Sequence, residues 1–133
     1  MDFSRHKEKF PPEISEYFYS SWNKRELWCL EFPRLAVPIS ELEWHLDYPF
    51  WSTKRPLPLF DLNPRAVLEN PQEFPKQWDR INAADLKYPI ELGTFGNRRV
   101  ILDGFHRLLK SIVSGAASVE CKLVPRDKIR TAA

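Results

Sequence analysis

The sequence predicts a small α/β (α+β) protein with a mixed sheet, and three neighbouring patterns support that prediction. An apolar run within residues 98–102 is typical of a buried strand. Apolar residues then recur at helical spacing over 105–114. Over 118–124 they alternate with polar residues, as in a half-buried strand. Together they predict a strand–turn–helix–strand unit, the most informative part of the chain.

Shorter elements are expected before this unit. Residues 13–22 follow Pro11-Pro12 and repeat apolar side chains at helical spacing, which predicts a first helix. Eight of the twelve prolines lie between Pro33 and Pro75, so only short helical segments are expected there. These segments fall at 41–45, at 65–69 and beyond residue 71. Further strands are predicted near 28–32, 35–39 and 88–94.

Length and composition predict one folded domain. The 133 residues are 43% hydrophobic and 14% aromatic, enough for a single core. We divide the domain into an extension (1–34), a core (35–125) and a tail (126–133). No run approaches 18 apolar residues and the first residues are charged, so neither a membrane helix nor a signal peptide is expected. Cys29 and Cys121 lie far apart in apolar runs, which predicts two buried thiols in a reducing cytoplasm.

The net charge of +2 hides an asymmetry. Residues 97–133 hold eight Lys/Arg and three Asp/Glu (8 − 3 = +5), whereas residues 1–96 hold twelve and fifteen (12 − 15 = −3). A basic C-terminal part is compatible with binding of a small anionic ligand. Its last basic residues are equally typical of a solvent-exposed tail. The imbalance is too small to predict general DNA binding. No Cys/His cluster has metal-site spacing, so no metal centre is expected.

The turn at Asp103 and Gly104 is the candidate anion site. The first N–H groups of a helix lack partners within it and carry partial positive charge, and glycine lets a ligand approach the backbone. The expected ligand-binding residues are Gly104, Phe105, His106, Arg107 and Lys110. A structural interpretation stays open, in which Asp103 caps the helix, His106 is a surface residue and Arg107 pairs with a nearby acid. Phe105 shares the apolar stripe of the helix and is predicted to lie in the core.

The aromatic segment 44–51 also has two interpretations. Its rings either cover the sheet and fill the core, or they form a wall of the ligand pocket where a base can stack.

Three stretches carry a resemblance to a known superfamily. The run Ile101–Lys110, which contains Asp103-Gly104-Phe105-His106-Arg107, resembles the D-G-x-H-R segment of the ParB/sulfiredoxin-like superfamily. Residues 85–92 resemble the strand that precedes that segment, and residues 37–42 resemble the opening strand. The resemblance covers roughly residues 35–125. It implies a nucleotide phosphate lying on the amides of the turn, with ATP, ADP or CTP and Mg²⁺ as candidate ligands.

Departures from the family patterns exclude some of the activities that occur in the superfamily. Sulfiredoxins carry a nucleophilic cysteine where this chain has Phe105, so their chemistry is not expected. The partition proteins of the family bind DNA through a following helix-turn-helix domain and carry a G-E-R-R phosphate box. This sequence has neither, and DNA is not an expected partner.

The kinase-like members of the superfamily leave one catalytic alternative. They use an Asp and a His of the turn, matched by Asp103 and His106, and an upstream Glu, for which Glu41 and Glu43 are candidates. The first hypothesis is therefore a binding domain for nucleotide or another small anion, acting as a sensor or with a protein partner. The alternative is a nucleotide-dependent small-molecule phosphotransferase resembling free-serine kinases, with Asp103 and His106 catalytic.

Overall fold

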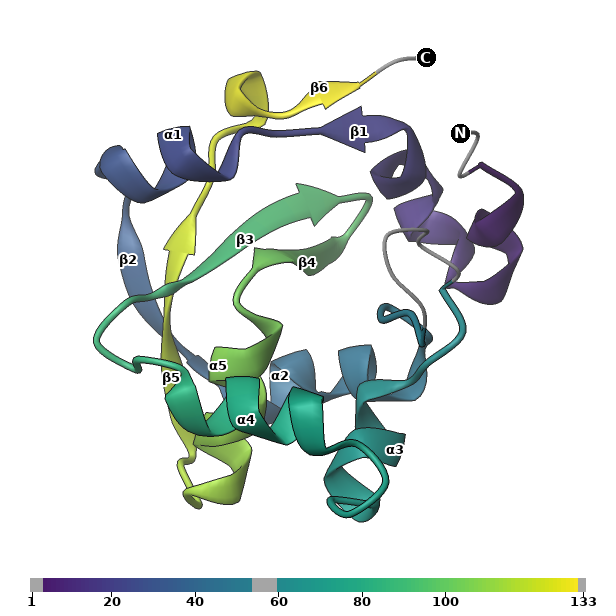
Figure 1. The fold of residues 1–133 in the computed structure, drawn as a ribbon. Coiled ribbons are helices and arrows are strands. Elements are labelled where there is room, and N and C mark those ends of the chain that lie inside the picture. The colour runs from purple at the N-terminus through teal and green to yellow at the C-terminus, as the bar shows by residue number, and fades with distance from the viewer. Residues whose placement is uncertain (1–3, 54–59, 132–133) are drawn as a thin grey trace.

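The computed structural model describes residues 4–53 and 60–131, and shows an α/β protein built around a four-stranded mixed sheet (Figure 1). The strand order is β2-β5-β3-β4, in which β3 runs parallel to β5 and the two outer pairs are antiparallel. The strands are β2 (Arg34–Pro38), β3 (Ile90–Phe95), β4 (Arg98–Asp103) and β5 (Ser118–Leu123). The predicted mixed sheet is confirmed, with four of the five expected strands in it.

The strand–turn–helix–strand unit also forms as expected. Strands β3 and β4 make a hairpin whose loop begins at Gly96, where φ is +59° and a residue with a side chain would be strained. Helix α5 (Phe105–Val113) follows β4 and leads to β5. The stripe on α5 buries Leu108 and Leu109, but Val113 at its end is exposed.

The sheet is covered on both faces, which explains why β4 is an apolar run rather than an alternating strand. Ile101 of β4 packs in one hydrophobic cluster, with side chains of the helices α2 (Ile39–Leu42), α3 (Pro64–Glu69), α4 (Pro75–Ala83) and α5. Val100 and Leu102 pack in a second cluster with the N-terminal segment. Figure 1 shows α3, α4 and α5 below the β3–β4 hairpin and the N-terminal segment above and beside it. The short helices expected at 41–45 and 65–69 are present, the first as α2 and the 3-10 helix η3 (Glu43–Asp47).

The N-terminal segment differs from the prediction. Its first helices are the 3-10 helices η1 (Ser4–Lys9) and η2 (Pro12–Tyr19). The strand predicted near 28–32 is wrong, because α1 (Lys24–Cys29) includes its first two residues and residues 30–32 form a connection without strand structure. The Asn23 side chain accepts a hydrogen bond from the N–H of Glu26 at 3.1 Å, and this N-cap outweighs the strand-like composition. Cys29 is consequently exposed, against expectation, whereas Cys121 is buried as predicted.

The C-terminal segment is attached to the fold rather than being a solvated tail. Strand β6 (Arg130–Thr131) pairs antiparallel with β1 (Ser20–Ser21). Arg126 forms an ion pair with Glu16 of η2, and Lys128 lies 3.1 Å from the carboxylate of Glu26 on α1. None of the helices within residues 4–53 and 60–131 has the length and apolar character that a bilayer crossing requires.

Candidate functional site

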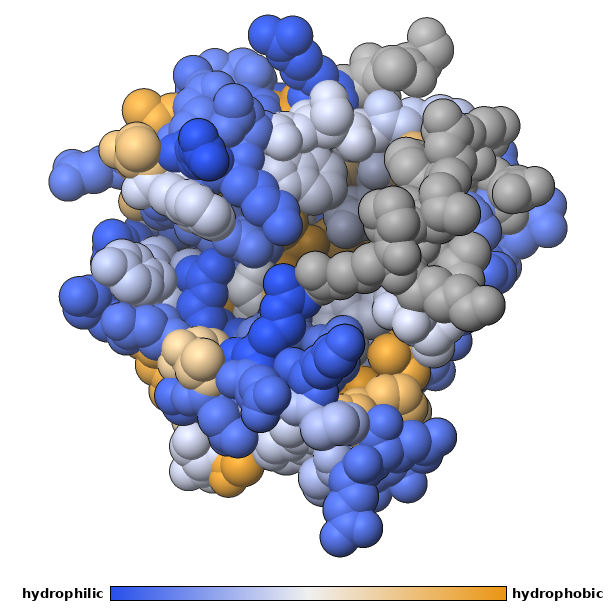
Figure 2. All heavy atoms as spheres, in the orientation of Figure 1, coloured by the Kyte–Doolittle hydropathy of each residue, from blue (hydrophilic) through white to orange (hydrophobic). Residues whose placement is uncertain are grey.

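A cleft of about 1410 Å³ opens where the start of α5 faces α1 and α4. Both hydrophobic clusters and five separate parts of the chain contribute to its walls. Figure 2 shows polar side chains surrounding a hollow near the centre of this face, with apolar atoms visible inside it. The four residues of the predicted turn, Gly104, Phe105, His106 and Arg107, all line this cleft.

Gly104 begins α5 and shapes the turn. Its φ is +120°, and a Cβ atom there would lie 3.0 Å from Cγ1 of Ile90 and 3.3 Å from Cζ of Arg107. Both the backbone conformation and the close packing therefore require glycine. Among the residues that the structure describes, no side chain caps this end of α5, so the suggestion that Asp103 serves as the cap is wrong. Because Gly104 lines the cleft, the positive end of α5 faces it.

The carboxylate of Asp103 is held by three donors instead. The indole Nε1 of Trp28 donates to Oδ2 at 2.8 Å, and Nη2 of Arg107 lies 3.2 Å from the same oxygen. The ammonium of Lys24 lies 3.6 Å from Oδ1. Two of these donors come from α1, so the N-terminal extension completes the polar environment of the turn.

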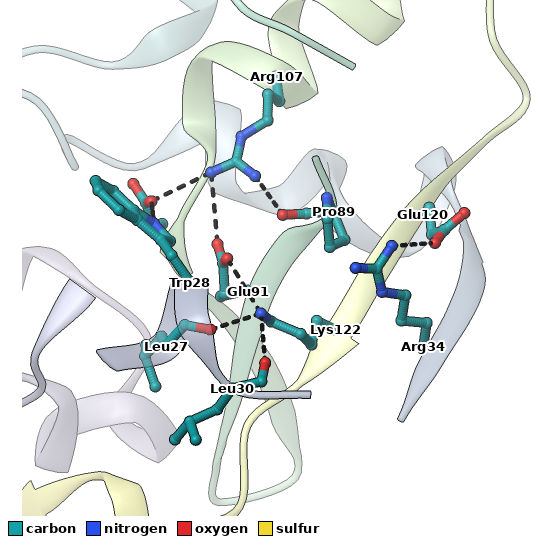
Figure 3. Close-up of polar contacts among 10 residues, drawn as sticks. Leu27, Trp28, Leu30, Arg34, Pro89, Glu91, Arg107, Glu120 and Lys122 are labelled. Atoms are coloured by element: carbon teal, nitrogen blue, oxygen red, sulfur yellow. Dashed lines mark hydrogen bonds and ion pairs between the residues drawn. The ribbon is translucent and has the colours of Figure 1, made fainter. Parts of the chain in front are cut away.

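Arg107 is the centre of this polar network. Its guanidinium donates to the carbonyl of Pro89 and to carboxylate oxygens of Glu91 and Asp103, at 3.4 and 3.2 Å (Figure 3). The side chain is only 13% exposed. The structural interpretation, in which Arg107 pairs with nearby acids, therefore describes what is observed.

Glu91 and Lys122 extend the network beneath the cleft. Both side chains are buried, and Nζ of Lys122 lies 3.9 Å from Glu91 Oε1. That ammonium also donates to the carbonyls of Leu27 and Leu30, at 2.5 and 3.0 Å, at the end of α1. Burial raises the pKa of the Glu91 carboxyl, and the Arg107 guanidinium opposes that effect. The strand pattern placed Lys122 on the exposed face of β5, so sequence reasoning missed this pair.

His106 lies against the aromatic segment. Its imidazole stacks on the Trp51 indole, with centroids 4.9 Å apart and planes inclined by 17°. Its Nε2 lies 2.7 Å from Oε1 of Gln77 on α4. His45 and Leu46 are buried, whereas Phe50 and Trp51 line the cleft. One part of the aromatic segment thus fills the core and another forms a wall of the cleft, whereas the stacking of a base on that wall stays a prediction.

Phe105 packs between the two hydrophobic clusters and also touches the cleft. It is half-buried, and its ring centroid lies 5.1 Å from Phe50 and 5.6 Å from His45. Lys110 lies elsewhere. Its ammonium donates to the carbonyls of Asn82 and Ala84 at the end of α4, at 2.9 and 2.7 Å. The partial negative charge at the C-terminus of α4 attracts this ammonium. Lys110 is not part of the cleft lining.

The two upstream glutamates are not brought to this cleft. Glu41 and Glu43 are exposed, and Glu41 lies 4.0 Å from Arg99 beside a separate shallow hollow. Asp103 and His106 therefore share the cleft with Glu91 rather than with either of them.

The cleft carries more cations than carboxylates. Five Lys/Arg residues line it against three Asp/Glu residues, among the described residues. These residues are Lys24, Arg34, Arg80, Arg107 and Lys122 against Asp85, Glu91 and Asp103. Arg80 was not predicted. It follows Gln77 by three positions on α4, and this i,i+3 polar pair was the available signal. Residues 4–53 and 60–131 hold no group of three metal-ligating side chains.

Comparison of the chain with protein-family models, curated proteins and solved structures finds no match.

Proposed function

We propose that the cleft binds the phosphate groups of a nucleotide at the start of α5. The carrying observation is that an uncapped, glycine-started helix N-terminus faces a cleft lined by five cations and three carboxylates. Backbone amides at a helix N-terminus and an excess of positive charge are the features that hold phosphate in proteins. The domain then acts as a ligand sensor or as the binding part of a protein assembly.

Within this proposal the cations have different tasks. Arg107 is already bonded to Pro89, Glu91 and Asp103, so it positions the turn and adds positive potential rather than gripping phosphate itself. Arg80 is exposed on the cleft wall, beside the Gln77 that contacts His106. Its guanidinium has the fork geometry for two phosphate oxygens. We therefore assign direct phosphate contact to Arg80 and to the amides of residues 105–107.

The arrangement also supports a ParB/sulfiredoxin-like fold, which we propose for residues 35–125. Of the three stretches that carry the resemblance, residues 37–42 span the end of β2 and helix α2, residues 85–92 lead into β3, and residues 101–110 span the end of β4 and the start of α5. Strands β2, β3 and β4 belong to one sheet. The free thiols of Cys29 and Cys121 are consistent with the proposed cytoplasmic setting.

The binding function is tested by a thermal-shift panel of ATP, ADP, CTP, GTP and inorganic phosphate, each with and without Mg²⁺. A ligand at 100 times its Kd stabilises a one-site protein by about 2.7 kcal/mol, which raises the Tm measurably. We expect at least one nucleotide to raise the Tm with a saturating concentration dependence. An unchanged Tm with all five ligands at millimolar concentration contradicts the proposal.

A second function, phosphoryl transfer, is favoured by one observation: Asp103, His106 and Glu91 line the same cleft. In that reaction an acceptor hydroxyl attacks the γ-phosphorus of ATP, the bond to the β-phosphate oxygen breaks, and the hydroxyl proton passes to His106 or a carboxylate. The test is ADP formation from ATP with free serine as acceptor. Loss of turnover with retained nucleotide binding in His106→Ala supports catalysis, and an absence of turnover in the native protein contradicts it.

A further inference from the structure

Two exposed aromatic side chains line the cleft beside the polar network. Trp28 of α1 is 56% exposed, and Tyr88, just before β3, is 57% exposed. Each presents more surface to solvent than the other aromatic residues that the structure describes as exposed. Single exposed rings are common on protein surfaces, but here two occur at one cleft.

Both residues adjoin the same polar network. Trp28 is bonded to Asp103, whose carboxylate also accepts from Arg107, and Arg107 donates to the carbonyl of Pro89, the residue after Tyr88. Figure 3 shows Trp28 and Pro89 on opposite sides of the Arg107 guanidinium. A continuous chain of three hydrogen-bond contacts and one peptide bond therefore connects Trp28 to Tyr88.

The hydrogen bond to Asp103 fixes the indole without covering it. Its 2.8 Å length holds Nε1 in place, while more than half of the side chain stays in contact with solvent. An immobilised ring loses little conformational entropy when a second ring stacks on it, which is the general advantage of preorganised sites. Tyr88 has the Lys87 ammonium 5.1 Å from its centroid, so a cation also accompanies that ring.

We propose that Trp28 and Tyr88 are stacking surfaces for a planar ring of the ligand, so that the cleft binds a nucleotide more tightly than inorganic phosphate or polyphosphate. The inference rests on the proposed phosphate site at α5 and adds the class of the remaining ligand part. Stacking tolerates any base, because every base has a π-face. The two rings should therefore increase the affinity for purine and for pyrimidine nucleotides alike.

The experiment compares ATP, CTP and inorganic tripolyphosphate by calorimetric titration. Removing one stacking ring typically costs about 1–3 kcal/mol, so Trp28→Ala and Tyr88→Ala should each weaken ATP and CTP about 5- to 150-fold. The Kd for tripolyphosphate should stay within about twofold of the native value. Leu86→Ala is the matched control, since Leu86 is exposed two residues from Tyr88 and is not part of the cleft lining.

Trp28→Phe separates stacking from the contact with Asp103. Phenylalanine keeps a ring but cannot donate to the carboxylate, so near-native nucleotide binding by this variant supports stacking. Equal loss for ATP and tripolyphosphate in Trp28→Ala and Tyr88→Ala, or no loss for either ligand, overturns the inference while leaving the phosphate site intact. If the native protein binds none of the three ligands, the proposed function itself fails. Because the Tyr88 side chain makes no hydrogen bond among the described contacts, and its backbone N–H bond to Asp85 survives the substitution, the Tyr88 variant remains informative if Trp28→Ala does not fold.

Discussion

The imidazole of His45 accepts the backbone N–H of Ile101 at its Nε2 atom, over 3.0 Å. Strand β4 is an edge of the sheet, so this contact satisfies a donor that has no neighbouring strand. The other ring nitrogen, Nδ1, donates to the carbonyl of Leu42 at 2.8 Å. The bonds of both nitrogens define one neutral tautomer, and His45 is fully buried.

This relationship predicts a pH-dependent stability. Burial lowers the pKa of His45 to about 3 from its usual 6.5, so the unfolded chain binds a proton between these values and the folded chain does not. The stabilisation is complete above pH 6.5 and falls as the pH decreases toward 3, by up to about 1.4 kcal/mol per pH unit. Urea denaturation at pH 7.5, 6.5, 5.5 and 5.0 measures it. In His45→Leu the free energy of unfolding should depend less steeply on pH over this range. An unchanged pH dependence would mean that His45 does not cause it.

Replacing Arg107 with alanine should destabilise the protein. The change leaves the buried carboxylate of Glu91 without its main counter-charge, and breaking a buried pair in this way typically costs about 3–5 kcal/mol. Arg34→Ala is the control, because its pair with Glu120 is exposed and is worth about 0–1 kcal/mol. Chemical denaturation gives both free energies. The double variant Arg107→Ala/Glu91→Gln should recover part of the loss, and equal stability of the two single variants would refute a structural role for Arg107.

Phe105 should contribute less to stability than a fully buried phenylalanine. Phe95 is fully buried, and its replacement with alanine should cost about 3–5 kcal/mol. Phe105 packs on both clusters but has one side in the cleft. Phe105→Ala should therefore lose less unfolding free energy than Phe95→Ala. Chemical denaturation of the two variants gives their unfolding free energies and tests whether Phe95→Ala is the less stable one. An unchanged stability in Phe105→Ala would show that its ring serves only the ligand.

Arg80→Ala should weaken nucleotide binding with little effect on folding. A hydrogen bond to a charged group is worth about 1.5–3 kcal/mol, which corresponds to roughly 10- to 150-fold in Kd. Lys76→Ala provides the matched control, since Lys76 is exposed on α4 and is not part of the cleft lining. Titration at low and high salt should show the difference between the two variants shrinking as ions screen the charge. Identical affinities for both variants would remove Arg80 from the site.

The unit from β3 to β5 was predictable because its signals are local. The change of period after Asp103 and the glycine of the turn determine where β4 ends and α5 begins, and the structure places both within one residue of the expectation. Helix α1 was missed for the opposite reason. Its strand-like composition concealed a single cap at Asn23, and one side chain can decide so short a segment.

The cleft itself was only partly predictable, since its walls come from distant parts of the chain. Trp28 and Asp103 are bonded across 75 positions, and no spacing rule connects them. Lys122 alternates with apolar residues as an exposed strand residue would, yet α1 covers it with two carbonyl groups. The burial of a charge thus depends on a neighbouring segment that the sequence pattern of the strand does not contain.

The β1–β6 pairing has a consequence for the order of folding. Ser20 pairs with Thr131, which closes a loop of 111 residues (131 − 20), whereas the β3–β4 hairpin closes over only a few. Loop closure costs more entropy as the loop grows, so we expect the hairpin and α5 to form early and the ribbon of the two chain-end segments to form late. Helix α1 lies between β1 and β2 and docks with that ribbon. In a refolding experiment, the ability to bind a nucleotide should therefore appear in the slowest phase, after most of the helical circular dichroism has returned.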